Sequence, residues 1–333
     1  SHIVTIPWPL IIKKALGFTS FSQNFNLEYY MAKWFDQLAK NRLEKPDIIV
    51  AWSGNALLTM KVAKNLGAKS IVERGSAHIK YQHELLQEEY DKFGVSRNNN
   101  KLMEEREIRE YDEADYISVP SQFTVDSFIE QGVSEEKLLK IPYGVHLDNF
   151  KECPKEDEVF RIIFVGSIGF QKGVYYLLIA FEELDLPDSE LVMIGGLKQK
   201  FKPHLQDHCN QNCINKGTIE HDQLYKYYSS GSVFVFPSIQ DGYGMVIHEA
   251  MACGLPVIAT KNTGGSEVIR DGKEGFIIPI RDVEAIKEKI IHFYEHPEKR
   301  KEMGQAAKKR VQKFTWEDYG DRIVREYKRI NEK

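Results

Sequence analysis

Two acidic residues eight positions apart, Asp241 and Glu249, stand where an apolar strand pattern gives way to a helical one. Residues 232–238 are typical of a buried parallel strand, and residues 245–253 have the apolar period of a helix that Gly254 could end. Asp241 is therefore expected in the loop at the carboxyl end of a strand, where open α/β sheets bind ligands. At ~1.5 Å of rise per helical residue, the two carboxylates would lie ~12 Å apart and could contact two ends of one long polar ligand.

The loop between these acids is suited to an anion. Gly242 and Gly244 let the backbone approach a ligand, and the amides of residues 243–245 begin a helix, whose N-terminus carries about half a positive charge. A second loop, Gly-Ser-Ile-Gly-Phe-Gln-Lys-Gly at 166–173, also joins a strand pattern to a helix, and its Lys172 could offer a point charge to a phosphate. Its spacing matches neither the Walker loop nor the dinucleotide-binding fingerprint. The alternative for both loops is an ordinary turn with solvated charges.

The remaining sequence alternates strand and helix patterns, which indicates an α/β fold with parallel sheets. A length of 333 residues favours two domains, and the polar, proline-containing segment 151–158 marks the expected boundary. We therefore predict one domain over residues 1–150, a second over 151–315 and a terminal helix over 316–333. The first strand pattern, residues 1–7, begins without lead-in, so the first domain is expected to lack an earlier strand–helix unit. The expected strands are residues 47–52, 69–73, 116–120, 161–166, 190–194, 232–238, 255–259 and 275–279.

The amino-terminal half contributes a histidine. Residues 74–79, Arg-Gly-Ser-Ala-His-Ile, follow a strand pattern and occupy the position where a ligand loop is expected. His78 could act there, or it could only satisfy backbone groups in a polar turn. The charged run from 82 to 113 is predicted to be solvent-exposed helix, and Ser121 is expected to cap the helix that follows the next strand.

Composition narrows the class of protein. A net charge of −4 gives no support for a nucleic-acid-binding protein with a broad basic surface. No apolar run approaches the ~18 residues that a transmembrane helix needs. The four cysteines are few for this length and are interpreted as reduced thiols in a cytoplasmic setting. A zinc site has a suitable spacing but no supporting motif, so no metal is expected. The residues with that spacing are His204, His208, Cys209 and Cys213.

In combination, these motifs resemble the retaining glycosyltransferases of family 4, whose GT-B fold has two Rossmann-like domains facing a central cleft. Asp241-x7-Glu249 is similar to the family's Glu-x7-Glu motif, and it continues as Glu-Ala-Met-Ala-Cys-Gly-Leu-Pro. The further matches are residues 166–173 with the family's Gly-Arg-x4-Lys-Gly loop, 143–145 with its Asn-Gly-Val segment, and 263–267 and 271–276 with its later glycine loop and the strand after it.

The resemblance implies a role for each of these residues. Lys172 would hold the diphosphate of a nucleotide-sugar donor, Glu249 would hold the ribose hydroxyls, and Asp241 would contact the transferred sugar. His78 is the candidate for the family's amino-domain histidine near the sugar, and the terminal helix 316–333 would cross back onto the first domain. The implied donor site is Gly166, Ser167, Lys172, Lys216, Gly217, Thr218, Ile219, Asp241, Gly242, Tyr243, Gly244, Met245 and Glu249, with the backbone of 216–219 near the base. The implied catalytic residues are Lys172, Asp241 and His78.

The implied reaction moves a sugar, with retention, from a nucleoside-diphosphate sugar to a glycan, lipid-linked or small-molecule acceptor, without a metal or other cofactor. Lys172 and the helix N-terminus would stabilise the charge on the leaving diphosphate. No carboxylate is placed as a covalent nucleophile, so retention implies front-face attack. The sequence departs from the family in three ways: Asp241 replaces a glutamate, Ser167 replaces the loop arginine, and the first strand with its acceptor-side glycine loop is not visible.

Two other functions stay open. A non-catalytic nucleotide-sugar or glycan-binding protein would account for Ser167 and the abbreviated start. A nucleotide-sugar epimerase of the same fold would bind the same donor without needing an acceptor. The expected location is the cytoplasm, with the inner face of a membrane as an alternative. The segment 10–15, Leu-Ile-Ile-Lys-Lys-Ala, could contact a membrane surface, although a buried segment fits its composition better.

Overall fold

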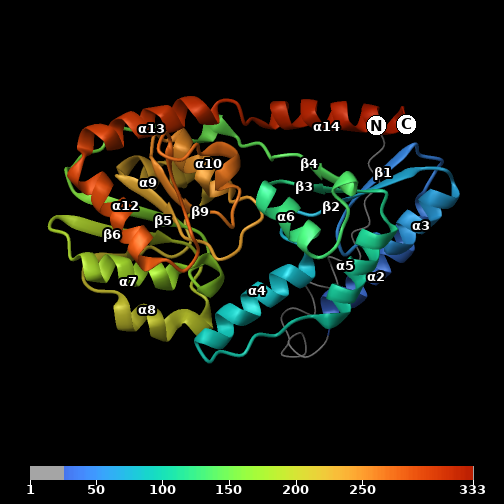
Figure 1. Ribbon diagram of the computed structural model, residues 1–333, viewed down its shortest axis with the longest axis horizontal. Coiled ribbons are helices and arrows are strands. Elements are labelled where there is room, and N and C mark those ends of the chain that lie inside the picture. Colours follow the sequence, from blue (N-terminus) through green and yellow to red (C-terminus); the bar gives the residue numbers. More distant parts are fainter. Residues whose placement is uncertain (1–25, 333) are drawn as a thin grey trace.

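The computed structural model describes residues 26–332 as two α/β domains that lie side by side, with the last helix running across the first domain (Figure 1). The α/β fold expected from the alternating patterns is confirmed. The strand pattern at 1–7 and the segment 10–15 lie outside the described residues.

The first domain contains a four-stranded parallel sheet in the order β1-β2-β3-β4. Its strands are β1 (Ile48–Trp52), β2 (Lys69–Glu73), β3 (Tyr116–Val119) and β4 (Leu138–Lys140). Its helices are α2 (Leu27–Ala39), α3 (Leu57–Asn65), α4 (Ile79–Lys92), α5 (Lys101–Glu113) and α6 (Gln122–Glu130). Ser121 caps α6 as expected, since its side chain accepts a hydrogen bond from the amide of Thr124 and a reciprocal bond completes a capping box.

The second domain contains a six-stranded parallel sheet in the order β10-β9-β8-β5-β6-β7. Its strands are β5 (Phe160–Val165), β6 (Ser189–Ile194), β7 (Cys213–Asn215), β8 (Val233–Phe236), β9 (Val257–Thr260) and β10 (Gly275–Ile278). Its helices are α7 (Val174–Leu184), α8 (Lys202–His208), α9 (Leu224–Ser230), α10 (Met245–Ala252), α11 (Gly265–Val268), α12 (Val283–Glu295) and α13 (Pro297–Val311). Helix α14 (Trp316–Asn331) follows.

The strand order of the second sheet reverses between β5 and β8. The chain passes from β5 outward to β6 and β7, then returns to pair β8 with the other side of β5 and continues to β9 and β10. Helix α7 packs against α8 and α12, and α10 packs against α9 and α13, so helices cover both faces (Figure 1). This cover explains why every residue of β8 and β9 is apolar or small and buried. The reversal places the loops after β5 and β8 next to each other, which is where such sheets bind ligands.

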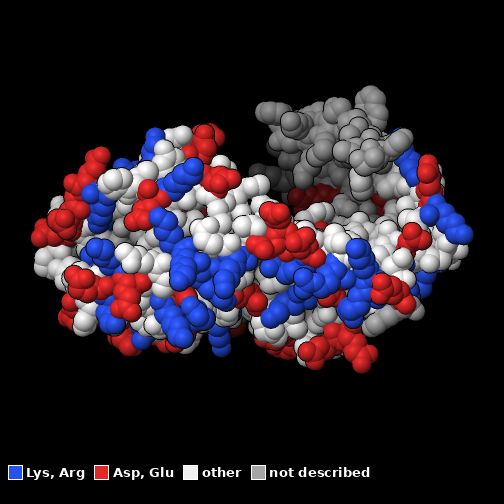
Figure 2. Space-filling view, turned by 90° about the horizontal axis from the view of Figure 1, so that it is seen from above, with Lys and Arg blue, Asp and Glu red and all other residues white. Residues whose placement is uncertain are grey.

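Helix α14 returns to the first domain. Ile330 is buried against Ile71 and Leu139 of the first sheet, with Tyr319 and Tyr327 packed beside them. Figure 2, seen from above, shows basic side chains gathered along α13 and α14 with acidic side chains among them, so this face is not uniformly basic. The helix thus adds a second covalent connection between the domains, besides the chain that follows β4.

The prediction that the charged run 82–113 is solvent-exposed helix is wrong for Glu89 in its first half and for several residues of its second half. The run forms two helices, α4 and α5, and Arg106, Glu107 and Glu110 of α5 are buried. Arg106 Nη2 lies 2.6 Å from Asp36 Oδ2. Glu110 Oε1 accepts the amides of Ala56 at 2.9 Å and of Leu57 at 3.1 Å, and therefore sits at the N-terminus of α3. These partners offset the cost of removing the charges from water, which the sequence pattern alone does not reveal.

The expectation of four reduced thiols is also wrong. Cys209 and Cys213 form a disulfide, whereas Cys153 and Cys253 are free. Helix α8 ends just before Cys209, and the turn into β7 brings the two Cα atoms to 5.2 Å, within the normal range for a disulfide. His204 packs among aromatic rings, and no group of metal-ligating side chains occurs within residues 26–332.

Candidate active site

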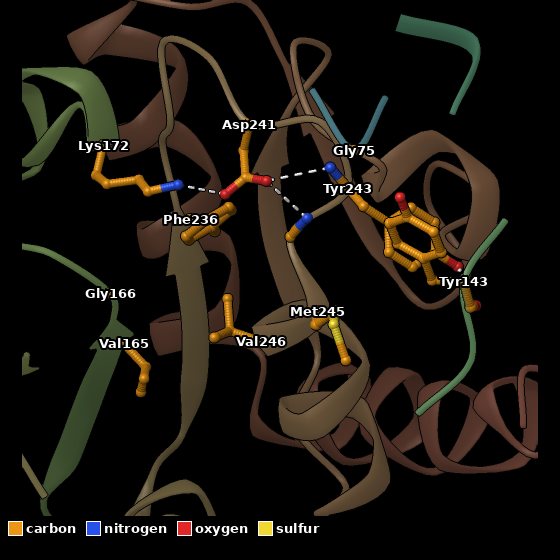
Figure 3. Close-up of a pocket in the computed structure, with 11 residues that line it drawn as sticks. Gly75, Tyr143, Val165, Gly166, Lys172, Phe236, Asp241, Tyr243, Met245 and Val246 are labelled. Carbon is orange, nitrogen blue, oxygen red and sulfur yellow. Dashed lines mark hydrogen bonds and ion pairs between the residues drawn. The ribbon is translucent and has the colours of Figure 1, made fainter. Parts of the chain in front are cut away.

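The loops after β5 and β8 form a pocket of about 240 Å³ at the carboxyl edge of the second sheet, next to the first domain (Figure 3). The second domain supplies most of its walls, and Gly75 and Tyr143 come from the first domain. The full lining is Gly75, Tyr143, Val165, Gly166, Lys172, Phe236, Asp241, Tyr243, Gly244, Met245 and Val246. The reversal of strand order therefore explains why two loops far apart in sequence share one site.

Asp241 has both carboxylate oxygens engaged. Its Oδ1 accepts the amides of Tyr243 at 3.1 Å and Gly244 at 2.9 Å, and its Oδ2 forms an ion pair with Lys172 Nζ (Figure 3). Gly244 has φ +73° and directly precedes α10, so these amides lie at the start of that helix. The carboxylate thus occupies part of the anion-binding position that the glycine loop was expected to provide for a ligand.

Lys172 is held in place by its own loop. It ends the short 3-10 helix η5 (Phe170–Lys172), and Gly173 follows with φ +64°. A Cβ at Gly173 would lie 1.9 Å from the carbonyl oxygen of Pro237, so no other residue fits there. Lys172 Nζ also lies 5.4 Å from the centre of the Phe236 ring. Among the described residues that line the pocket, Lys172 is the one with a basic side chain, and it points at Asp241.

Glu249 lies further along α10 and does not line the pocket. It is 3% exposed; its Oε2 accepts the Tyr228 hydroxyl at 2.9 Å, and its Oε1 is 2.9 Å from His221 Nε2. His221 begins the 3-10 helix η7 (His221–Gln223), and its side chain is 62% exposed. His221 was not among the predicted site residues. It lies two residues after segment 216–219, which the resemblance matched to the base-binding region, so its position was an available signal.

Residues 216–219 lie beside the ends of β6 and β7. The Lys216 amide donates to the Met193 carbonyl at 2.9 Å, and the Gly217 carbonyl accepts the Gly195 amide at 2.8 Å. Lys216 lines a different hollow, shared with residues 153–157. None of these residues lines the pocket of Lys172, and neither does Ser167, although its neighbour Gly166 does.

His78 is buried away from the pocket. Its ring centre lies 5.0 Å from those of Tyr111 and Phe128, and its backbone amide donates to Ser127 Oγ at 2.9 Å. Burial lowers the pKa of His78 to about 4, with smaller effects from the charges of Arg74 and Lys80. The imidazole is therefore neutral at pH 7.

A comparison with protein families decides what the second domain is. Residues 147–310 match the family model described as glycosyl transferases group 1. The second domain is therefore similar to the group 1 glycosyltransferases over residues 147–310. The expected resemblance is confirmed at this level.

Curated relatives of this domain are named for the transfer of different sugars. The chain is 32% identical over 219 residues to sulfoquinovosyl transferase of Arabidopsis thaliana, covering 61% of this chain and 42% of that protein. It is 27% identical over 237 residues to lipopolysaccharide 1,2-N-acetylglucosaminetransferase of Salmonella typhimurium, covering 64% of this chain and 61% of that protein. The matched region thus spans about half the length of these relatives.

Solved glycosyltransferase structures share the fold over most of the chain. Sucrose-phosphate synthase from Thermosynechococcus elongatus aligns with a TM-score of 0.72 at 22% identity, covering 91% of this chain and 78% of that one. Anabaena HepE in complex with UDP and glucose aligns with a TM-score of 0.70 at 17% identity, covering 93% and 83%. The predicted GT-B fold is confirmed. None of the helices between residues 26 and 332 combines the length and hydropathy of a membrane span.

The structure brings together only part of the predicted donor site. Six of the predicted residues line one pocket. Ser167 and Gly242 lie in the two loops that form the pocket but do not line it, whereas the others lie further along α10, at the edge of β6 and β7, or in the first domain. The residues that meet are Gly166, Lys172, Asp241, Tyr243, Gly244 and Met245. Tyr143, which also lines the pocket, was predicted only as part of a motif; its carbonyl accepts the Tyr243 hydroxyl at 2.8 Å.

Proposed function

We propose that this protein is a retaining glycosyltransferase that moves a sugar from a nucleoside-diphosphate donor to an acceptor held by the first domain. The observation that carries the proposal is the pairing of Lys172 with Asp241 beside the start of α10, at the strand-order reversal of a domain similar to the group 1 glycosyltransferases. One cation, one helix N-terminus and one carboxylate are the groups that a diphosphate and a sugar hydroxyl need.

Donor binding exchanges the partners of Lys172. A diphosphate reaches Lys172 Nζ in competition with the Asp241 carboxylate, and Met245 and Val246, which begin α10, line the same pocket. When the diphosphate takes the lysine, Asp241 is free to accept hydrogen bonds from the transferred sugar. The ion pair therefore keeps both side chains oriented toward the pocket before the donor arrives.

The leaving group is stabilised by charge that the fold already holds in place. Cleavage of the bond between sugar and phosphate develops negative charge on the diphosphate and positive charge on the sugar ring. Lys172 and the N-terminus of α10 act on the first, and preorganised charges of this kind lower the barrier without reorganising during the reaction. Because these groups supply the positive charge that a cation would supply, we propose that transfer proceeds without a metal ion.

Glu249 is proposed to hold the ribose. It lies on the helix whose start faces the pocket, and its partner His221 adjoins residues 216–219, which we propose lie against the base. Of its two partners, Tyr228 is fully buried while His221 is mostly exposed, so ribose hydroxyls can displace the histidine without disturbing the core.

The acceptor is proposed to be a glycan, a lipid-linked intermediate or a small molecule. It would approach from the first domain, which contributes Gly75 and Tyr143 to the pocket. His78 stays a proposed catalytic residue through its place in the loop that carries Gly75, although its ring does not reach the pocket. The proposed location is the cytoplasm, with the inner face of a membrane as the alternative if the acceptor is lipid-linked.

The test is a donor screen followed by product analysis. One solved neighbour binds UDP-glucose and one relative is named for GDP-mannose, so thermal shift with UDP-, GDP- and ADP-sugars comes first. Donors that bind are then incubated with acceptor glycans and lipids, and the configuration of the new bond is read by NMR. Lys172→Ala should abolish transfer, while Lys301→Ala, an exposed lysine of α13, serves as the control. Binding without transfer to any acceptor would indicate a binding protein, and a changed free sugar would indicate an epimerase.

A further inference from the structure

Gln240, the residue before Asp241, is fully buried where the two domains meet. Its Nε2 donates to Ser76 Oγ of the first domain at 2.6 Å. Its Oε1 accepts Gln82 Nε2 of the first domain at 3.2 Å and Gln171 Nε2 of the second at 3.1 Å. One glutamine side chain therefore joins three elements. Both members of the pocket ion pair come directly after a glutamine of this group: Asp241 follows Gln240, and Lys172 follows Gln171.

The first-domain end of this connection is anchored by buried charge. Gln82 Oε1 accepts Arg74 Nη2 at 2.7 Å, and Arg74 Nη1 lies 2.7 Å from Glu107 Oε2. Arg74 Nε also donates to the Ala77 carbonyl at 3.1 Å, which shapes the loop that presents Ser76. The position of Gln240 is thus set by a charged pair inside the first domain rather than by mobile surface side chains.

The residues after Asp241 also contact the first domain. The Gly242 carbonyl accepts Ser121 Oγ at 2.6 Å, and a Cβ at Gly242 would lie 2.0 Å from the Gly75 carbonyl oxygen. Asp241 is therefore flanked on both sides by residues whose contacts cross the domain interface. Asp241 itself turns the other way, toward Lys172 in its own domain.

We propose that Gln240 is a positioning residue that transmits the relative placement of the two domains to the Asp241 carboxylate. The proposal rests on the function proposed above. Gln240 is fully buried and its side-chain polar atoms bond to Ser76, Gln82 and Gln171, so it acts through its protein partners rather than on the donor. Its hydrogen bonds hold the backbone that carries Asp241 against the loop of Gly75 and Ser76. The Asp241 carboxylate therefore reaches the sugar only when the two domains are in contact. Loss of these bonds lowers the transfer rate and leaves nucleotide binding, which depends on the second domain, intact.

The experiment compares Gln240→Leu and Ser76→Ala with an interface control. Leucine keeps the side-chain volume while removing every polar contact, and Ser76→Ala removes a single bond from the opposite domain, so it also serves if the leucine variant fails to fold. The control is Lys200→Met, which removes a hydrogen bond between the domains at the Ser96 carbonyl, 2.6 Å from Lys200 Nζ and outside the pocket.

The expected result is a fall in kcat of about ten- to a hundredfold for Gln240→Leu and about three- to tenfold for Ser76→Ala. The dissociation constant for the nucleoside diphosphate, from calorimetry, should change less than twofold in both. Combining the two substitutions should cost little more than Gln240→Leu alone, because both remove the same bond. A kcat within twofold of the parent, a loss matched by Lys200→Met, or an equal loss of nucleotide affinity would each overturn the proposal.

Failure of this inference can be told from failure of the proposed function. If the parent protein transfers no sugar from any donor that it binds, the proposed function fails. Small-angle scattering then still measures whether Gln240 holds the two domains together. Gln240→Leu should have a larger radius of gyration than the parent, and Lys200→Met should not. An unchanged radius in Gln240→Leu would show that the residue does not hold the domains together.

Discussion

Lys172 and Asp241 lie 69 residues apart in sequence and form an ion pair in the pocket formed by the loops after β5 and β8. The two residues come from the two loops that the strand-order reversal brings together. Lys172 is proposed to bind the diphosphate of the donor, and Asp241 is proposed to bind the transferred sugar. If the donor competes with Asp241 for Lys172, the affinity of the protein for a nucleoside diphosphate depends on the charge of Asp241 as well as on that of Lys172.

The first prediction concerns the charge of Asp241. Asp241→Asn keeps an oxygen for the amides of Tyr243 and Gly244 but removes the charge that competes for Lys172. The affinity for free nucleoside diphosphate should therefore rise by about two- to fivefold, while transfer collapses because the sugar loses its carboxylate. Calorimetry with the nucleotide, beside initial rates with the sugar donor, measures both effects.

Two further substitutions serve as controls for this prediction. Asp241→Glu restores the acid that the family usually carries and should keep measurable transfer. Lys172→Ala should weaken nucleotide binding by about ten- to a hundredfold. A loss of nucleotide affinity in Asp241→Asn as large as that in Lys172→Ala would contradict the exchange of partners.

The second prediction concerns Glu249. Glu249→Ala removes the proposed ribose acceptor and should weaken nucleoside diphosphate binding by ~1.5–3 kcal/mol, about ten- to a hundredfold. It also leaves the Tyr228 hydroxyl buried without its acceptor, so the melting temperature should fall. His221→Ala leaves Tyr228 paired and should not lower the melting temperature. If both variants bind nucleotide as well as the parent does, Glu249 has only a structural role.

The third prediction concerns metal ions. Lys172 and the start of α10 stand where a cation would otherwise act on the diphosphate, so transfer should persist in excess EDTA. Initial rates with and without chelator, and after addition of manganese or magnesium, measure this. Complete loss of activity in EDTA that either metal restores would contradict the proposal.

The fourth prediction concerns His78 and stability at mildly acid pH. Burial lowers the pKa of His78 to about 4, below its ordinary value of 6.5, so between these values the unfolded chain binds a proton that the folded chain does not. The contribution of His78 to stability should therefore fall as pH decreases from about 6.5 toward 4. His78→Phe, which keeps a ring between Tyr111 and Phe128, should reduce this dependence.

Denaturant unfolding at pH 5 and pH 7.5 tests that prediction. His248 is also buried with a lowered pKa, of about 3, so the dependence should shrink without disappearing. The exposed His296 is the control position for a histidine-to-phenylalanine change. An unchanged pH dependence in His78→Phe would contradict the prediction, and full transfer activity in the same variant would remove His78 from the catalytic residues.

The sequence by itself determined which segments around the site form strands and helices, and which loops follow the strands. Apolar periods located the strands around the site, and the glycine loops at 166–173 and 241–244 could be assigned to strand ends because strand, loop and helix are local patterns. The resemblance that those loops carried predicted the GT-B fold correctly. Ser121 was recognised as a helix cap because it directly precedes an apolar helical period, which is a local pattern.

Only the tertiary structure decided how side chains pair. The ion pair of Lys172 with Asp241, the three bonds of Gln240 and the disulfide at Cys209 all depend on how chain segments approach one another in space. Helix α5 gives a further example. Its sequence predicts that Glu110 is a surface residue, and only the structure shows that the N-terminus of α3 and Arg106 lie beside it. Burial of a charge is set by partners distant in sequence, and a linear pattern of polar and apolar residues carries no record of them.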